Sequence, residues 1–319
     1  MKVDERLPIY EMSINLRAGW QAHSLSNAGN EGSNRLLPRR QLLADGTVTD
    51  ACSGNIAKHH HAALLAEYFA ETGVDLCPAC AARDGRRAGA LSERYGYKDL
   101  SIERILRGCG LCDAHGFLAV AKNATEGAEA RQKLSKHSLI EFSYALALPG
   151  HQDQSWQIAT RSGASKEDGQ MLMRLPVRSG QYALLVRYRA VGVGVDTETW
   201  RVVEGDSGER RRRHWAILSA LRDSILSPNG ALTATTLPHL TGLVGAVVVR
   251  STVGRAPVYS PLVDGFVEQL TMLAGDACGV YPFETVAAFG ALMQQLIDTS
   301  DPCLPAQGRR WERGGMSNE

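Results

Sequence analysis

Residues 9–18 read IYEMSINLRA, and this stretch decides which kind of fold the chain adopts. Apolar and polar side chains alternate along it. The apolar face holds Met12, Ile14, Leu16 and Ala18, and the polar face holds Glu11, Ser13, Asn15 and Arg17. A period of two is typical of a β-strand that buries one face. The sequence therefore predicts that the ordered chain begins with a strand of a sheet.

The elements that follow predict an α+β fold. Strand patterns cover residues 115–121, 138–148, 181–195 and 243–249, and helical patterns cover residues 54–73, 209–226, 263–273 and 285–297. Ser53 is suited to cap the first helix, which continues to Gly73. The order strand, helix, strand, strand, helix, strand is that of a ferredoxin-like or RRM-type domain with large insertions.

Three stretches show no such periodicity. Residues 19–51 are rich in Asn, Gly, Ser and Arg, and we expect a long polar loop there. Residues 149–178 predict a flexible excursion, and residues 305–319 a frayed tail. Loops of such length inside a compact domain tend to be functional.

Composition limits the class of protein. Of the 319 residues 44% are hydrophobic and 22% charged, which excludes wholesale disorder. No apolar run approaches the roughly 20 residues of a membrane span, and the N-terminus lacks an apolar signal core. We therefore expect a cytoplasmic protein with no membrane partner. The net charge of +1 does not decide on nucleic acid, and the excess of Arg over Lys fits either phosphate binding or a GC-rich genome.

Four of the seven cysteines form two CxxC pairs. Cys77 and Cys80 make the first pair, and Cys109 and Cys112 the second. Four thiolates suit tetrahedral Zn²⁺ and leave no open coordination position, so the predicted zinc site is structural. The alternative is four unrelated reduced thiols. Cys52, Cys278 and Cys303 fit no ligand pattern.

Polar and basic side chains of the predicted loop suit phosphate and ribose contacts that read no base sequence. The candidates are Arg17, His23, Ser24, Asn27, Asn30, Asn34, Arg35, Arg39 and Arg40. Ser53, Gly54, Lys58 and His59 follow at a predicted helix start, where free N–H groups also favour phosphate. His59, His60 and His61 are about 100° apart around a helix, so they cannot chelate one ion together, and ordinary surface histidines are the alternative.

An ordered set of motifs resembles a known family. The motifs are AHSLSN at 22–27, GSNR at 32–35, CSGNIAKH at 52–59, CDAHGFL at 112–118, IEFSYAL at 140–146 and SGQYAL at 179–184. They resemble the DevR-type "Cas seven" backbone subunits of type I CRISPR Cascade complexes, which belong to the RAMP superfamily. The resemblance covers most of residues 9–250. Members of this family polymerise along a guide RNA (crRNA) and have an RRM-like palm, a finger insertion and a thumb.

The resemblance implies a division of the chain. The palm takes residues 1–73, with the RNA-facing loop, and residues 179–304. Residues 74–112 become a zinc-bearing finger insert, residues 113–148 the return to the palm, residues 149–178 the thumb and residues 305–319 a flexible tail. Met171 and Met173 would then wedge between bases, although local packing is the alternative.

The function that follows is non-catalytic guide-RNA binding in a CRISPR interference complex. The expected partners are the crRNA, target DNA paired with it, further copies of the chain and other Cascade subunits. The alternative is a RAMP-fold endoribonuclease that uses His59 or His60 for guide processing, or a loop acid such as Glu31 for target cleavage. Gly242, Gly245 and Gly254 are too sparse for the Gly-rich segment of processing enzymes. We therefore assign no catalytic residue.

Overall fold

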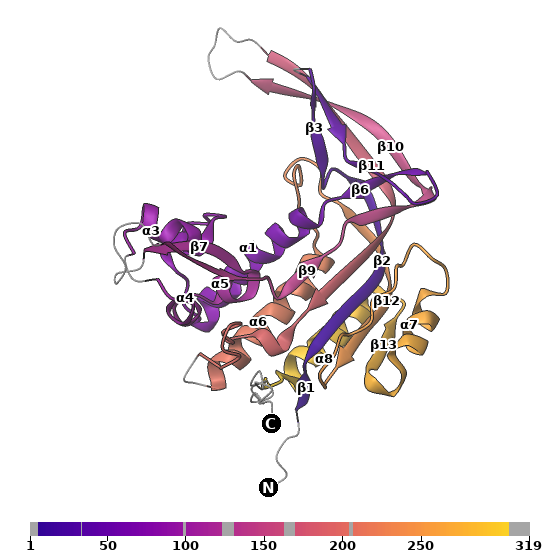
Figure 1. Ribbon diagram of the computed structural model, residues 1–319. Coiled ribbons are helices and arrows are strands. Elements are labelled where there is room, and N and C mark those ends of the chain that lie inside the picture. Colours follow the sequence, from indigo (N-terminus) through magenta and orange to yellow (C-terminus); the bar gives the residue numbers. More distant parts are fainter. Residues whose placement is uncertain are drawn as a thin grey trace, which may run out of the picture.

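The computed structural model describes residues 6–32, 34–97, 100–122, 131–162, 170–203 and 207–305. It shows a mixed α/β protein with one large twisted sheet, helices against that sheet and a smaller helical lobe beside it (Figure 1). Apart from Pro305, the predicted flexible tail lies outside the described residues. Within the described ranges, no helix is both long and apolar enough to cross a membrane.

Ten strands of the described part of the chain form the large sheet. Its main path runs through β13 (Gly279–Phe283), β12 (His239–Arg250), β2 (Glu11–His23), β11 (Gln170–Tyr188), β10 (Ala145–Ser162), β6 (Val48–Cys52) and β5 (Arg40–Leu42). The strands β3 (Asn27–Glu31), β4 (Arg35–Pro38) and β9 (Ile140–Phe142) join off this path. β2 pairs antiparallel with both β11 and β12, so the first predicted strand lies inside the sheet.

Both faces of β2 are covered. Its apolar side chains belong to the main core. Its polar side chains bond to an extended segment, residues 255–261, which we call the strap. These bonds join Glu11 Oε1 to the N–H of Ala256 (3.1 Å), Ser13 Oγ to the carbonyl of Pro257 (2.6 Å), Asn15 Oδ1 to the N–H of Tyr259 (3.0 Å) and Arg17 Nε to the carbonyl of Pro261 (2.6 Å). The polar half of the alternation therefore reflects side-chain hydrogen bonds to the strap.

Helices lie on both faces of the sheet. The main core contains side chains of α1 (Gly54–Thr72), α6 (Ser207–Leu226) and α8 (Val286–Thr299), and a second, smaller core contains side chains of α7 (Phe266–Ala274). Along β12, Val247 and Val249 belong to the main core, whereas Ala246 and Val248 pack with α7. Successive strand residues point to opposite faces, so β12 separates the two cores.

The helix ends agree with the sequence prediction. Ser53 Oγ accepts the N–H of Asn55 (3.3 Å) at the start of α1, and Gly73 ends this helix with a left-handed φ of 70°. Thr285 Oγ1 accepts the N–H of Ala288 (3.0 Å) at the start of α8. Local caps of this kind depend only on residues a few positions apart, which explains why the sequence predicts them.

The smaller lobe begins with residues 77–112, the Cys-bounded insert. It contains α2 (Pro78–Ala81), η1 (Arg87–Ala90), α3 (Leu91–Arg94) and α4 (Ile102–Gly108), and α5 (Gly110–His115) continues beyond its end. The hairpin of β7 (Phe117–Lys122) and β8 (Arg131–Lys136) completes the lobe. The short elements elsewhere are β1 (Leu7–Ile9), which pairs in parallel with β14 (Ser300–Pro302), η2 (Ala190–Gly192) and η3 (Gly275–Ala277).

Two predictions of irregular structure are wrong. Residues 19–51 contain the end of β2 and the strands β3, β4, β5 and β6. Residues 149–162 and 170–178 form most of the described β10–β11 hairpin, whose pairing runs from Gln152 opposite Gly180 to Ser162 opposite Gln170. This ribbon projects beyond the helices in Figure 1. Among the described residues of these stretches only Trp20 and Leu25 belong to the main core, so most of the strands lack an apolar face that a hydrophobic pattern could reveal.

Candidate metal centre and nucleic-acid interface

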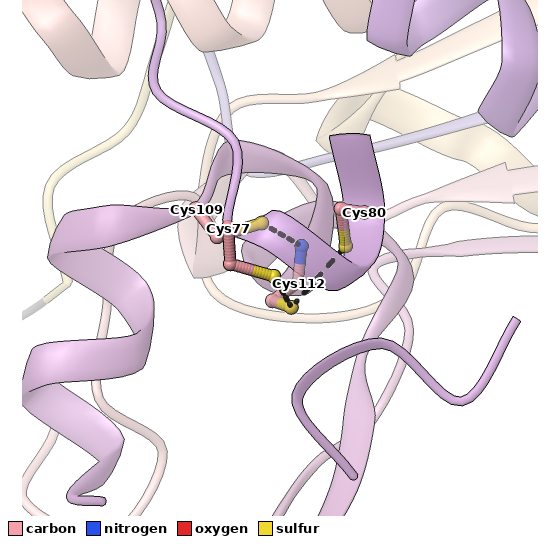
Figure 2. Close-up of side chains that lie close together, drawn as sticks. All are labelled: Cys77, Cys80, Cys109 and Cys112. Atoms are coloured by element: carbon pink, nitrogen blue, oxygen red, sulfur yellow. Dashed lines mark hydrogen bonds between the residues drawn. The ribbon is translucent and has the colours of Figure 1, made fainter. Parts of the chain in front are cut away.

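The four predicted zinc ligands converge. Cys77 and Cys109 precede the first turns of α2 and α5, and Cys80 and Cys112 lie one turn further along these helices. Figure 2 shows the side chains turned toward a common point, with both helix starts facing it. The four Sγ atoms lie within 4.8 Å of one another, and all four residues are buried. The chain thus brings together two cysteine pairs that are separated by 28 residues.

The spacing of the sulfur atoms fits a tetrahedral metal ion. A Zn–S bond of about 2.3 Å places the sulfurs of a tetrahedral site roughly 3.8 Å apart. Sγ of Cys112 lies 3.9 Å from Sγ of Cys77 and 3.6 Å from Sγ of Cys80. The donor set is all sulfur, which Zn²⁺ accepts as closed structural coordination. The residues present therefore fit a structural zinc ion.

A buried ionic cluster ties this lobe to the rest of the molecule. Asp113, directly after Cys112, accepts hydrogen bonds from Arg213 Nη1 (3.0 Å) and from the N–H of Gly194 (2.8 Å). Its other oxygen accepts from Lys136 Nζ, which also donates to the carbonyl of Gly192 (2.9 Å). Burial alone would raise the pKa of the Asp113 carboxyl, but the charges of Lys136 and Arg213 hold it below its usual value. The cluster joins α5, β8, α6 and the segment after β11.

A histidine pair makes a second connection. His61 Nδ1 of α1 lies 2.8 Å from His115 Nε2 of α5, and both rings are buried. Burial lowers the pKa of His61 to about 3, so the ring is neutral near pH 7. His61 therefore differs from its exposed neighbour His59, and the ring of His60 bonds to the carbonyl of Ser227 (2.9 Å). These contacts give the three consecutive histidines three different environments.

Three exposed residues of the predicted RNA set lie on β3, on β4 and on the turn between them. Asn30, Asn34 and Arg35 are exposed there. β3 pairs with β4, and β4 touches the β10–β11 hairpin where Arg35 lies opposite Arg174. The guanidinium of Arg35 lies over the partly exposed ring of Trp156, 4.7 Å from its centroid, and pairs with Glu31 (2.7 Å). Arginine stacked on an aromatic ring is a surface on which nucleobases can stack.

Of three further candidates, Arg39 and Arg40 have polar side-chain partners within the protein and Asn27 has none in the described part of the chain. Arg39 donates to Ser26 Oγ (3.1 Å) and to the carbonyl of Asn27 (2.9 Å). Arg40 pairs with Asp50 (3.2 Å) and is exposed. Both polar atoms of the half-buried Asn27 side chain lack a hydrogen-bond partner in the described part of the chain. Arg40 and Asn27 therefore retain capacity for a ligand, whereas Arg39 first of all orders the loop.

His23 and Ser24 lie inside the protein. His23 is fully buried, and its Nε2 lies 2.8 Å from the hydroxyl of Tyr182. Burial and then the charge of Arg178 lower the pKa of His23 to about 3. The side chain of Ser24 is also buried. In this structure neither side chain faces solvent, and we assign them a supporting role in place of the predicted direct contact.

The start of α1 presents the remaining polar candidates. Ser53 caps the helix, and Gly54 follows it at a position where a Cβ atom would lie 2.4 Å from the carbonyl oxygen of Phe142. Only glycine allows this close approach. Lys58 is half-buried and His59 is exposed one turn later. Lys58 is therefore partly accessible and His59 fully accessible near the start of α1.

Arg17 and the methionines lie elsewhere. Arg17 belongs to the strap side of β2, where it pairs with Asp264 (2.8 Å). Met171 and Met173 lie on β11 near the tip of the long hairpin. Met173 is half-buried, and the side chain of Met171 lies outside the described residues. The structure therefore does not bring Arg17 together with the other predicted contacts.

Two residues of the interface have no counterpart in the sequence prediction. Arg178 is fully buried and donates from Nη1 to the carbonyls of Ala51 (3.3 Å) and Arg39 (3.4 Å), and from Nη2 to Ser26. It thereby holds the base of the hairpin, β6 and the loop after β2 together. Trp156, the partner of Arg35, is an isolated aromatic residue in a polar stretch. That isolation is the signal that could have identified it.

The fold and the site define a mixed α/β protein with a four-cysteine lobe and a projecting β10–β11 hairpin. The model of the family described as "CRISPR-associated negative auto-regulator DevR/Csa2" matches residues 14–271. The chain belongs to this family, as its motifs predicted. No curated protein matches the chain at a significant level.

Solved structures with a similar course of the chain share little sequence with it. One chain of a "CRISPR RNA-guided surveillance complex, pre-nicking" has 14% identity and a TM-score of 0.47, with 90% of this chain and 99% of that chain covered. A chain of a "CRISPR RNA-guided surveillance complex" has 14% sequence identity and a TM-score of 0.44, with 90% of this chain and 98% of that chain covered. Csc2 of Thermofilum pendens has 12% sequence identity and a TM-score of 0.37, with 92% of this chain and 87% of that chain covered. The family assignment rests on the family model alone.

Proposed function

We propose that the chain is a non-catalytic, guide-RNA-binding backbone subunit of a CRISPR interference complex in the cytoplasm. The observation that carries this proposal is its membership of the DevR/Csa2 family over residues 14–271. In the subunits that its motifs resemble, copies polymerise along a crRNA, and the guide then pairs with target DNA. The protein holds the RNA by its backbone and shape, while base pairing reads the target.

The topology supports an RRM-like palm. The sheet path β12-β2-β11-β10, with β9 as a further partner of β11, has α1 and α6 packed into one core. Numbered along a strand, helix, strand, strand, helix, strand unit, this is the order 4-1-3-2 of a ferredoxin-like sheet. The β10–β11 hairpin takes the place of the thumb, and the Cys-bounded insert with its zinc ion takes that of the finger.

The arrangement of the polar groups supports binding without catalysis. In the described part of the chain, His59 is not hydrogen-bonded to a carboxylate that could orient it as a base, and His60 bonds to a backbone carbonyl. Glu31 pairs with Arg35. General acid–base catalysis needs a positioned group near the reacting atoms, whereas phosphate binding needs accessible cations. Arg35, Arg40 and Lys58 are accessible cations that can bind phosphate.

The test compares two triple variants with the same loss of charge. Neutralising Arg35, Arg40 and Lys58 to Gln should weaken binding of single-stranded RNA and flatten its salt dependence by roughly 0.7 per lost phosphate contact. The control neutralises Arg86, Arg94 and Arg107, which already pair with acids of the insert. Equal slopes for both variants and the wild type would contradict the proposal.

A cleavage assay separates the alternatives. Purified protein is incubated with precursor guide RNA and with complementary target RNA, with and without Mg²⁺. We expect both RNAs to stay intact. A specific product that disappears in Glu31→Ala or His59→Ala would establish an endoribonuclease instead.

A further inference from the structure

Two basic side chains meet where α1 contacts the smaller lobe. Lys58 precedes His61 by three residues on α1, so both lie on one side of the helix. His61 bonds to His115 at the end of α5. Within the smaller lobe, η1 packs against β7, which begins shortly after His115. A Cβ atom on Gly89 of η1 would lie 2.5 Å from the carbonyl oxygen of Leu118 in β7. The charge of Arg87, at the start of η1, lowers the pKa of both Lys58 and His115, so this side chain lies near the same junction.

Arg87 differs from the other arginines of the insert. Arg83 pairs with Glu67 (3.4 Å), Arg86 and Arg94 pair with Asp84 (3.1 Å each), and Arg107 pairs with Glu103 (2.9 Å). Among the described residues, Arg87 has no acidic partner and neither has Lys58. Both side chains are half-buried, so water compensates their charge only in part.

The positive charges at this junction lack an anionic partner within the described part of the chain. Burial and then the charge of Arg87 lower the pKa of Lys58, and Glu141 acts in the opposite direction. Glu141 itself pairs with Arg187 (3.2 Å). His115 contributes no negative charge, and its Nδ1 is buried without a hydrogen-bond partner within the described ranges. The positive charges of Lys58 and Arg87 thus repel each other, and no acidic group in the described part of the chain forms a salt bridge with either of them.

The backbone fixes this arrangement. Arg87 has a left-handed φ of 51° although it is not glycine. Such a conformation costs free energy and persists only where the surrounding structure determines it. The tight packing of Gly89 two residues later supplies that constraint.

We propose that Lys58 and Arg87 together bind one phosphate group of a single-stranded nucleic acid. Arginine offers a planar pair of donors and lysine a compact charge, and a phosphate between them turns their repulsion into attraction to a shared partner. The lobe thereby contributes directly to the interface, through a residue outside the predicted RNA-binding set. This inference rests on the proposed function, because it presumes a nucleic-acid ligand.

The experiment measures the salt dependence of RNA binding for the full-length chain and four variants. Arg87→Gln, Lys58→Gln and the double variant are compared with Arg83→Gln, an exposed and paired arginine of the same insert. The slope of log K against log salt should become shallower by roughly 0.7 in the double variant, the value of one phosphate contact. Arg83→Gln should leave it unchanged.

The outcomes keep this inference apart from the proposed function. If the slope in the double variant becomes shallower by about twice the roughly 0.7 of one phosphate contact, Lys58 and Arg87 bind two separate phosphates and the shared site is overturned. RNA binding by the wild type with an unchanged slope in the double variant would overturn the site while the proposed function stands. A second probe, stabilisation by tripolyphosphate in thermal unfolding, should be present in the wild type and Arg83→Gln and lost in the double variant. Absence of both RNA binding and this stabilisation in the wild type would overturn both.

Discussion

Asp113→Asn is the change that should damage the molecule most without touching a zinc ligand or an exposed residue. The Asp113 carboxylate is 1% exposed and neutralises Lys136 and Arg213, which are both buried. An Asn amide can still accept the N–H of Gly194, but its Nδ2 is a donor that faces a cation. Removing one partner of a buried ionic group typically costs about 3–5 kcal/mol.

The expected shift in melting temperature follows from the length of the chain. With roughly 2.1 cal/mol/K of unfolding entropy per residue, 319 residues give about 0.7 kcal/mol/K, so the loss corresponds to a Tm lower by roughly 4–7 °C. Calorimetry measures it directly. Asp276→Asn, the same chemical change at an exposed carboxylate, is the control and should lie within about 0.5 kcal/mol of the wild type.

A double variant tests the reason for the loss. Asp113→Asn combined with Lys136→Met removes the cation that Asn leaves unpaired, so the two changes should be strongly non-additive. A loss below about 1 kcal/mol for Asp113→Asn, or simple additivity in the double variant, would refute the view that the buried charges depend on one another.

Three further predictions concern the metal, the pH and the interface. Zinc analysis should give about one ion per chain, and Cys80→Ser should release it and unfold the smaller lobe before the large sheet; full zinc retention would contradict the site. The pKa values of His23, His61 and His214 are lowered to about 3 in the folded chain from an ordinary 6.5, chiefly by burial. The unfolded chain therefore binds more protons between those values, and stability should fall as the pH falls below 6.5, by roughly 2 kcal/mol per histidine at pH 5. Urea unfolding at pH 7 and pH 5 measures this, and equal stabilities would contradict it. Gly54→Ala should destabilise the start of α1 and weaken RNA binding, because the added Cβ meets the carbonyls of Phe142 and Ser143 at 2.4 and 2.6 Å, whereas Gly73→Ala at the other end of the helix should lower stability alone.

Features of the molecule that depend on neighbouring residues could be predicted from the sequence. Ser53 and Gly73 bound α1 through bonds that span a few positions. The cysteine pairs could be matched across the insert because the coordination chemistry of zinc requires four ligands, although nothing local links Cys77 to Cys109. The landmark Cys112-Asp113-Ala114-His115 now has a physical reason, because it supplies a thiol, the buried carboxylate and the partner of His61.

Features that depend on distant contacts could not be predicted in this way. His23 is polar and follows a strand, and its burial depends on Tyr182, which lies 159 positions away. Arg17 has the composition of a phosphate ligand, but residues 261 and 264 engage it. The strands of residues 19–51 are held by backbone bonds to one another and to the long hairpin. Such pairing leaves no trace in a pattern of apolar residues.

The position of β2 has a consequence for how the chain folds as it is made. β2 leaves the ribosome well before its two sheet neighbours, β11 and β12, and before the strap. The bonds from Ser13 and Arg17 to the strap each span 244 positions. The apolar side chains of β2 therefore stay exposed on the nascent chain until these later elements have been synthesised. Contacts between residues so far apart in sequence form slowly. We infer that the sheet reaches its final form only after the strap has been synthesised, and that a truncation before the strap leaves the polar face of β2 uncovered.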